Sequence, residues 1–321
     1  MDPQITGLHH VTAIATQPQE NVDFYRDILG LRLVKKTVNF DDPGTYHLYY
    51  GDGEGSPGTI MTFFPWPQAR RGSRGVGQAT VTSFSVPQAS LGYWADRLRA
   101  QNVLFEDPKT RFDEDVLTVL DGDGLKLELV AHQGAEDRPP WAGGGVPEKY
   151  AVRGFHSVTL EEVTSGPTIQ VLEKMGFRKT QESGSRRRFE IADGGAGHQL
   201  DILERPDGQY GRIAAGTVHH VAFRTPDDAN QAEWQKEIAG LGLGVTEVRD
   251  RQYFRSIYFR EPGGTLFEIA TDPPGFTFDE SVEDLGTGLK LPPWLESRRQ
   301  EIETILLPID GKTPAAAKED K

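Results

Sequence analysis

The order of apolar and polar runs repeats four times along the 321-residue chain. Each repeat reads as a short strand, an amphipathic helix and then three further strands. The opening strands fall at residues 7–14, 79–84, 154–158 and 218–223. Internal repetition of this kind is typical of folds built from copies of one supersecondary unit. The sequence therefore predicts an α+β fold made of four βαβββ modules.

The helix of each repeat is predicted from apolar residues at helical spacing. In the first repeat Val22, Tyr25, Ile28 and Leu29 follow this spacing, and Gly30 is placed to end the helix. The matching residues in the later repeats are Leu91, Trp94 and Leu98, then Ile169, Leu172 and Met175, then Trp234 and Ile238.

A segment rich in Gly, Pro and charge, 134–150, separates the second repeat from the third and is interpreted as a linker. Modules one and two are therefore assigned to residues 1–133, and modules three and four to 151–285. Residues 286–321 are predicted to form a short C-terminal helix followed by a flexible tail, since Thr313–Lys321 has the composition of disorder.

Charge and composition exclude several classes of function. The net charge of −13 argues against a nucleic-acid partner or an anionic membrane surface. No apolar run approaches the length of a membrane span, and the chain does not start like a signal peptide. Because the sequence contains no Cys, disulfides, thiol catalysis and Cys-ligated metals are excluded. A cytoplasmic protein is expected.

Metal-binding residue types gather in two opening strands. Four of the eight His form the pairs His9-His10 and His219-His220. Strand side chains alternate between the two faces of a sheet. Alternation places the second His of each pair on the face with a polar residue, and the first on the face with apolar residues. His10 and His220 are therefore predicted to face a cleft.

Glu268 is a lone carboxylate inside the apolar strand 263–270. Burying a charge there is costly unless the charge is paired or bound to a metal. Glu268 is therefore predicted to join His10 and His220 as the third ligand of one metal ion. Two imidazoles and one carboxylate are the facial triad of non-haem Fe(II) oxygenases. The aligned residue of repeat one is Thr62, which is not a carboxylate.

Repeats two and three resemble a metal-free copy. Glu128 and Asp201 occupy the position of Glu268, but their opening-strand partners are aligned as Ser83 and Ser157, which are poor ligands. Because the ligands come from repeats one and four, these modules are predicted to pair around the metal. Modules two and three then form the other half. His156, together with His132 and His198, is interpreted as structural.

Several motifs follow one another in a fixed order between about Gly7 and Asp284. They are Leu8-His9-His10-Val11-Thr12, Tyr46-His47-Leu48-Tyr49-Tyr50, Gly58-Thr59-Ile60-Met61-Thr62, Arg153-Gly154-Phe155-His156-Ser157, Val218-His219-His220 and Pro262-Gly263-Gly264-Thr265-Leu266-Phe267-Glu268. With these motifs the chain resembles the vicinal oxygen chelate superfamily, and within it the hydroquinone-type ring-cleaving (extradiol) dioxygenases such as chlorohydroquinone dioxygenase. This resemblance implies two open-barrel domains of the glyoxalase-dioxygenase type.

The resemblance also implies roles for individual residues and a reaction. The metal ligands of the family fall on His10, His220 and Glu268. Catalytic positions fall on His9, His219, Arg251 and Tyr258, and a substrate-binding position falls on Thr12. The implied metal is Fe(II), with Mn(II) as an alternative, and the implied substrates are a small aromatic diol and O2. Hydroquinone and catechol cleavage both remain open.

Two other functions remain open on the same scaffold. One is a glyoxalase-like metal-dependent isomerase or lyase, against which Thr62 counts because a second carboxylate would be expected there. The other is a non-enzymatic protein that binds a small molecule or confers resistance, in which the two His pairs and Glu268 would be coincidental. Exposed strand edges also leave assembly into a homo-oligomer open.

Overall fold

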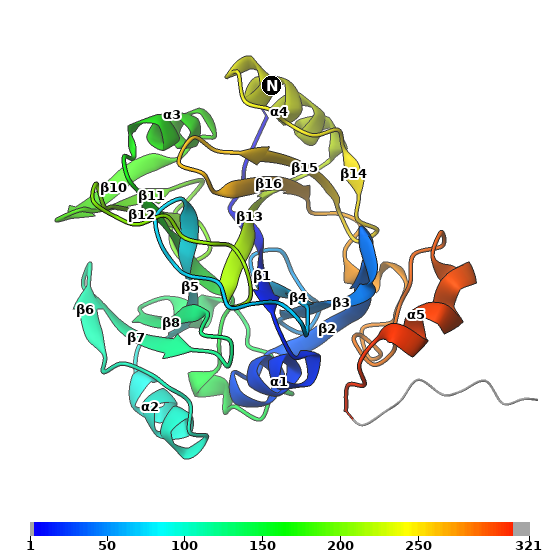
Figure 1. Ribbon diagram of the computed structural model, residues 1–321. Coiled ribbons are helices and arrows are strands. Elements are labelled where there is room, and N and C mark those ends of the chain that lie inside the picture. Colours follow the sequence, from blue (N-terminus) through cyan, green and yellow to red (C-terminus); the bar gives the residue numbers. More distant parts are fainter. Residues whose placement is uncertain (1–2, 311–321) are drawn as a thin grey trace, which may run out of the picture.

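The computed structural model describes residues 3–310 and has the predicted α+β class. Its strands form two curled eight-stranded sheets, as Figure 1 shows. The four predicted modules are present, so the expected fold of the vicinal oxygen chelate type is confirmed. The tail predicted at Thr313–Lys321 lies outside the described residues.

The four modules follow one another along the chain, and the two 3-10 helices η2 (Ala135–Asp137) and η3 (Glu148–Tyr150) lie between the second and the third. The first two modules contain β1 (Leu8–Ala15), α1 (Pro18–Val22), η1 (Asp23–Ile28), β2 (Arg32–Asn39), β3 (Asp42–Gly51) and β4 (Ile60–Pro65), then β5 (Gln78–Pro87), α2 (Leu91–Ala100), β6 (Lys109–Arg111), β7 (Glu114–Leu120) and β8 (Lys126–His132). The last two contain β9 (Phe155–Glu162), α3 (Gly166–Lys174), β10 (Arg178–Ser183), β11 (Arg186–Glu190) and β12 (Gln199–Glu204), then β13 (Thr217–Thr225), α4 (Asp228–Gly240), β14 (Arg249–Asp250), β15 (Arg255–Arg260) and β16 (Leu266–Thr271).

Each sheet combines two modules. The first has the order β14-β15-β16-β13-β1-β4-β3-β2, from modules four and one, and the second has the order β10-β11-β12-β9-β5-β8-β7-β6, from modules three and two. The opening strands β1 and β13 pair antiparallel, and each pairs parallel with the last strand of its own module. The centre of the first sheet therefore consists of β16, β13, β1 and β4.

The two sheets lie back to back and curl in opposite directions, with helices in the angles between them (Figure 1). Helix α3 lies beside α4, where Lys174 pairs with Glu237, and α2 lies beside the first helix, where Arg97 donates to the carbonyl of Ile28. One large apolar core fills the space between the sheets and the helices. The concave faces of the two sheets therefore open on opposite sides of the molecule.

The helices bury the apolar residues predicted from their spacing, among them Trp94, Leu172 and Ile238. The first helix differs from expectation because α1 ends at Val22 and continues as the π-helix η1. Within residues 3–310, every helix is too short or too polar to cross a membrane.

The segment after β16 packs against the edge of the first sheet. It contains η4 (Phe276–Phe278), η5 (Glu296–Arg298) and the predicted C-terminal helix α5 (Arg299–Ile305). Lys35 of β2 is fully buried, and its ammonium group contacts Asp279 at 2.6 Å and also Glu280. This buried ion cluster anchors the C-terminal segment beside the concave face of the first sheet.

Candidate metal centre

Strand register brings His10, His220 and Glu268 together at the centre of the first sheet. Ala222 of β13 pairs with His10 of β1 on one side and with Glu268 of β16 on the other. His220 lies two residues before Ala222, so its side chain leaves the same face of the sheet. Three residues that are far apart in sequence therefore converge on the concave side.

The three side chains present one ligand atom each to a common point. His10 Nε2 lies 3.3 Å from Glu268 Oε2, His220 Nε2 lies 2.9 Å from the same oxygen, and the two nitrogens are 3.2 Å apart. Atoms bound at roughly 2.1 Å to one metal ion and at right angles are about 3.0 Å apart. The spacing therefore fits three ligands on one face of an octahedron.

The hydrogen bonding of Glu268 also fits a metal. Its Oε1 accepts a hydrogen bond from Ser256, but Oε2 has no hydrogen-bond partner among the described residues. Glu268 is fully buried, and a buried oxygen without a partner is costly. A cation bound between the three ligand atoms would provide the missing partner. Within residues 3–310 these residues form the one group with metal-binding geometry.

The first His of each pair does not lie where strand alternation predicts it. Between Leu8 and His10 the pairing of β1 with β13 shifts by one residue, and the extra residue is His9. A second shift between β1 and β13 leaves His219 as the extra residue of β13. A β-bulge re-aims the side chain of its extra residue. His9 therefore contacts the ring of Phe254 on the ligand side instead of the face predicted.

The re-aimed imidazoles contact the ligand imidazoles directly. His9 Nδ1 lies 2.9 Å from His10 Nδ1, and His219 Nδ1 lies 2.7 Å from His220 Nδ1. Each contact requires one hydrogen between the two nitrogens. When the ligand imidazole supplies this hydrogen, its Nε2 keeps a lone pair for a metal. The neighbouring His thus fixes the tautomer and the ring orientation of the ligand.

Electrostatics favours a neutral His220 and an ionised Glu268. Burial lowers the pKa of His220, and burial together with His220 lowers the pKa of His219 to about 3. Burial alone would raise the pKa of Glu268, but the neighbouring His10 and His220 outweigh it and hold this pKa well below its usual range. Neutral imidazole and ionised carboxylate are the forms that bind a divalent metal.

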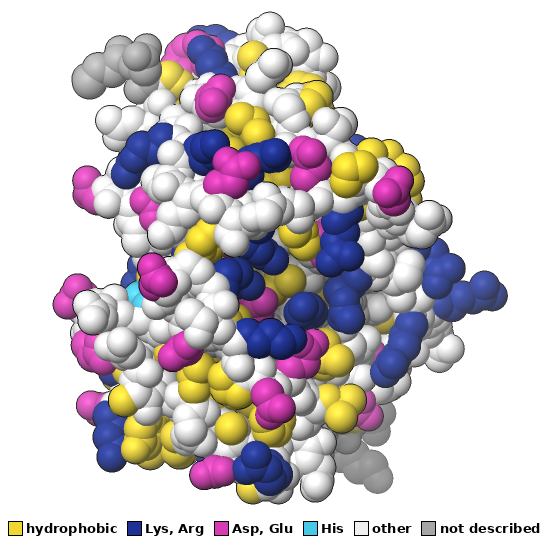
Figure 2. All heavy atoms as spheres, turned by 90° about the vertical axis from the view of Figure 1, so that its left-hand side faces the viewer, with side chains coloured by type: hydrophobic (Ala, Val, Ile, Leu, Met, Phe, Trp, Pro, Cys, Tyr) yellow, Lys and Arg dark blue, Asp and Glu magenta, His cyan; other side chains and the backbone are white. Residues whose placement is uncertain are grey.

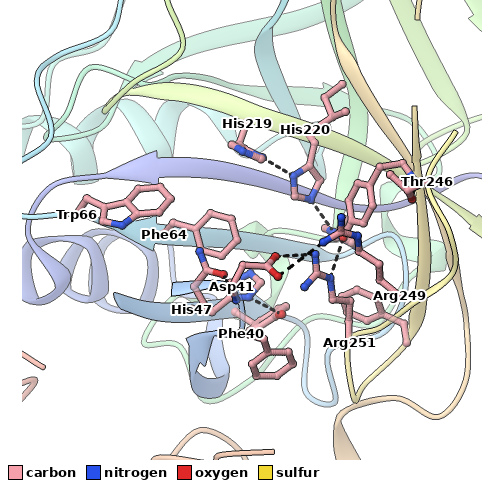
Figure 3. Close-up of a pocket in the computed structure, with 16 residues that line it drawn as sticks. Phe40, Asp41, His47, Phe64, Trp66, His219, His220, Thr246, Arg249 and Arg251 are labelled. Carbon is pink, nitrogen blue, oxygen red and sulfur yellow. Dashed lines mark hydrogen bonds and ion pairs between the residues drawn. The ribbon is translucent and has the colours of Figure 1, made fainter. Parts of the chain in front are cut away.

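A cavity of about 410 Å³ opens beside the ligands His10 and His220, and Figure 3 shows how its lining side chains surround it. This volume lies in the range of small-molecule sites. The wall is largely aromatic, so the cavity suits a small aromatic molecule. The aromatic and apolar lining residues are Phe40, Tyr49, Phe64, Trp66, Phe254, Tyr258 and Leu266.

Of the other candidate site residues, His219, Arg251 and Tyr258 line the cavity, whereas His9 and Thr12 are buried behind it. Arg251 Nε donates to the hydroxyl of Tyr258 at 3.2 Å, and a terminal nitrogen of Arg251 contacts Asp41 at 3.0 Å. Tyr258 pairs with Glu268 across β15 and β16, so both side chains leave the same face of the sheet.

His47 also lines the cavity, although the sequence did not single it out. Its Nδ1 lies 2.8 Å from the hydroxyl of Tyr49, and its Nε2 lies 2.8 Å from the hydroxyl of Thr62. Thr62 in turn lies 2.9 Å from the hydroxyl of Thr12. The available signal was the alternation of His47 with Tyr49 in a strand, which places both side chains on one face.

The second sheet repeats this arrangement without ligands. Ser83 pairs with Glu128 in the same way as Thr12 pairs with Thr62, so Ser83 is the counterpart of Thr12. The counterpart of His10 lies two residues earlier and is Val81, not Ser83 as the sequence alignment predicted. The sequence alignment was wrong here because equivalent residues in two opening strands can be identified only when the pairing register of each strand is known. Val81 has no ligand atom.

In this half, Arg residues take the place of a metal. Glu128 receives two hydrogen bonds from Arg111, and Asp201 is held by Arg186 and Arg188. His156 contacts Glu114 at 2.9 Å, in keeping with the predicted structural role. Figure 2 shows the side of the molecule to which this half opens, where basic side chains gather around a hollow.

The sequence matches the Glyoxalase/Bleomycin resistance protein/Dioxygenase superfamily over residues 7–129 and 159–269. The chain belongs to this superfamily. The first matched segment covers modules one and two and the second covers most of modules three and four, so together they include His10, His220 and Glu268.

Members of the superfamily resemble the chain over nearly its full length. It is 48% identical to "Putative ring-cleaving dioxygenase MhqO" of Bacillus subtilis, over 97% of this chain and 98% of the relative. It is 36% identical to a chlorohydroquinone/hydroquinone 1,2-dioxygenase of Sphingobium indicum, over 93% and 95% of the two chains. The crystal structure of a dioxygenase, described as putative, from Bacillus subtilis superposes with a TM-score of 0.92 at 47% identity, covering 97% and 99%.

Proposed function

We propose that this protein is an Fe(II)-dependent dioxygenase that opens a hydroquinone-type aromatic ring with O2. The observation that carries the proposal is the convergence of His10, His220 and Glu268 Oε2 on one point beside an aromatic-lined cavity. The 36% identity to a chlorohydroquinone/hydroquinone 1,2-dioxygenase supports this substrate class. Both atoms of O2 enter the ring-opened product, so the reaction needs no external reductant.

The residues present fit Fe(II), which would be held by His10, His220 and Glu268. Iron bound there would supply the electron exchange between an aromatic diol and O2. Mn(II) suits similar ligands. In place of a fourth protein ligand, Thr62 bonds to His47 and Thr12, which disfavours a glyoxalase-like site.

The surrounding side chains would orient the ring and stabilise charge. His9 and His219 would hold the two ligand imidazoles in place through their Nδ1 atoms. Arg251 is always charged, and its contact with the Tyr258 hydroxyl leaves the hydrogen of that hydroxyl free to donate into the cavity. This pair would stabilise negative charge that develops on oxygen during the reaction. Thr12 would support the substrate side through Thr62.

The proposal is tested by metal content and oxygen uptake. The purified protein is loaded with Fe(II) without oxygen and then supplied with oxygen and a panel of hydroquinones and catechols. We expect one iron per chain and oxygen consumption that depends on a hydroquinone. Bound iron without oxygen uptake would favour an isomerase or lyase. Failure to bind any divalent metal would refute the assigned centre.

A further inference from the structure

We propose that His47 accepts the proton that the aromatic hydroxyl loses when the substrate binds, and that this proton reaches His47 through the hydroxyl of Thr62. This inference rests on the proposed function. It assigns a task to a residue that belongs neither to the ligand triad nor to its supporting His pairs.

His47 is the centre of a continuous chain of hydrogen bonds. The chain runs from the Thr12 hydroxyl to Thr62 at 2.9 Å, from Thr62 to His47 Nε2 at 2.8 Å, and from His47 Nδ1 to the Tyr49 hydroxyl at 2.8 Å. Every member can both donate and accept a hydrogen bond. The chain can therefore reverse its direction and pass a proton along without moving its heavy atoms.

The position of Thr62 connects this chain to the metal centre. In module one, Thr62 of β4 pairs with Thr12 of β1. In module four, Glu268 of β16 pairs with Ala222 of β13 in the equivalent way. Thr12 in turn pairs with His220 as Ala222 pairs with His10. Thr62 is thus the counterpart of Glu268 across the approximate two-fold axis of the sheet. Its hydroxyl is buried at the strand position from which a fourth ligand would come, and it connects Thr12 to His47, which lines the cavity.

The other polar side chains of the site are poor proton acceptors. His9 and His219 use Nδ1 to accept from the ligand imidazoles, so their remaining nitrogen carries a hydrogen. Burial and the charge of Glu268 raise the pKa of Tyr258 above its usual range, so this hydroxyl keeps its proton. Arg251 cannot accept a proton. Among the lining residues described, His47 is the imidazole that does not contact a ligand His.

The proton transfer balances without a further reactant. Burial lowers the pKa of His47, so the imidazole is neutral before the substrate binds and one nitrogen carries a lone pair. Its imidazolium would then be stabilised by the negative charge left on the ring oxygen. The substrate O–H bond breaks and leaves its electron pair on the ring oxygen, while Thr62 takes this proton and gives its own to His47 Nε2. The products are a ring oxyanion and an imidazolium. His47 lines the cavity shown in Figure 3, so it is placed to return this proton later in the reaction.

The decisive variant is His47→Gln, because a Gln side chain can keep both hydrogen bonds but cannot take up a proton. We expect kcat/KM for a hydroquinone to fall roughly 100-fold or more at neutral pH. The loss should shrink as the pH is raised, since more substrate then arrives already ionised. Iron content should not change. Activity equal to that of the wild type, or a loss that is the same at every pH, would overturn the proposal.

A second measurement does not depend on turnover. The iron-loaded protein is mixed with a hydroquinone without oxygen, and the ultraviolet absorption of the bound ring reports whether its hydroxyl is ionised. We expect an ionised ring on the wild type at neutral pH, and a ring that ionises only at higher pH on His47→Gln. An ionised ring on the variant at neutral pH would overturn the proposal.

His132→Gln is the matched control, because His132 lies in the half without a metal centre and contacts Ser85 there. It should behave as the wild type in both measurements. If the wild type itself neither consumes oxygen nor binds a hydroquinone, the proposed function fails and this inference falls with it. A wild type that works, beside an unaffected His47→Gln, refutes the inference alone.

Discussion

His9 and His219 are each the extra residue of a β-bulge at the junction between β1 and β13. The two bulges are related by the approximate two-fold axis that relates modules one and four. Each turns an imidazole that would otherwise face the apolar core toward the ligand imidazole beside it. Each opening strand therefore provides one candidate ligand and one imidazole in contact with it.

Replacing Glu268 by Gln should weaken metal binding roughly 10-fold or more, because the variant keeps the shape of the side chain but loses the charge that holds the cation. Iron content after dialysis against a graded chelator measures this effect. The control is Glu128→Gln, at the equivalent position of the other sheet, where Arg111 is the partner. Equal iron retention in Glu268→Gln and the wild type would contradict the assignment of the ligand.

Replacing His9 by Phe should lower metal affinity by about 10- to 100-fold, because His10 loses the group that holds its Nδ1. The variant His9→Gln, whose side-chain oxygen can accept from His10, should recover part of this affinity. Competition with a chelator gives the metal affinity of each variant. Since His9 does not line the cavity, the KM of metal-saturated protein should stay near that of the wild type. A large rise in KM at full metal loading would point to direct contact with substrate.

Replacing Tyr258 by Phe should reduce kcat about 100-fold with unchanged iron content, because the cavity loses the hydroxyl that Arg251 orients. Steady-state oxygen uptake gives kcat and KM separately. Arg249→Met removes a neighbouring charge that also lines the cavity but lies 3.7 Å from its partner Asp41. This control should change kcat far less than Tyr258→Phe. Similar losses in both variants would assign the effect to general disturbance of the cavity.

The buried carboxyl group of Glu162, which does not belong to the metal centre, should make the free energy of unfolding depend on pH. It is fully buried, both carboxyl oxygens lack hydrogen-bond partners among the described residues, and burial with the nearby charge of Glu261 raises its pKa to about 8. The folded state therefore holds a proton that the unfolded chain releases near pH 4.5. The free energy of unfolding should fall as pH rises between these values, by up to about 1.4 kcal/mol per pH unit.

Glu162→Gln should remove this pH dependence, because the amide is neutral in both states. Denaturant unfolding between pH 5 and pH 9 measures the difference, and the variant should be the more stable form at pH 9. The exposed Glu173→Gln provides the control and should follow the wild type at every pH. A Glu162→Gln variant whose stability changes with pH as that of the wild type does would show that this carboxyl is ionised in the folded state.

The repeat pattern was sufficient to predict the fold class. The four modules follow from the spacing of apolar residues, because each helix must bury one of its faces and each central strand must bury both of its faces. The π-helical turn at Asp23–Ile28 could not be predicted, since its apolar spacing also fits an α-helix. The expected domain boundaries, by contrast, remain an interpretation of the sequence.

Parts of the site depend on pairing register, which a single sequence does not contain. Strict alternation put His9 on the wrong face because a bulge changes the count by one residue. The same uncertainty led to Ser83, where the structure has Val81, as the counterpart of His10. His47 could not be ranked from sequence because its importance comes from Thr62 and Tyr49, two contacts that only the folded sheet brings to it.

The Arg-filled cleft of the second sheet has a consequence for the first. Arg111 and Arg188 neutralise the carboxylates of Glu128 and Asp201 in the second sheet, so this half needs no ion from solution to balance them. In the proposed metal centre, Glu268 would depend on a cation taken from solution. Binding of metal to the folded state alone adds free energy that grows with the logarithm of the free metal concentration. The two halves of one chain should therefore respond differently to metal starvation, and hydrogen exchange at the amides of β13 and β16 should quicken while that of β9 and β12 stays constant.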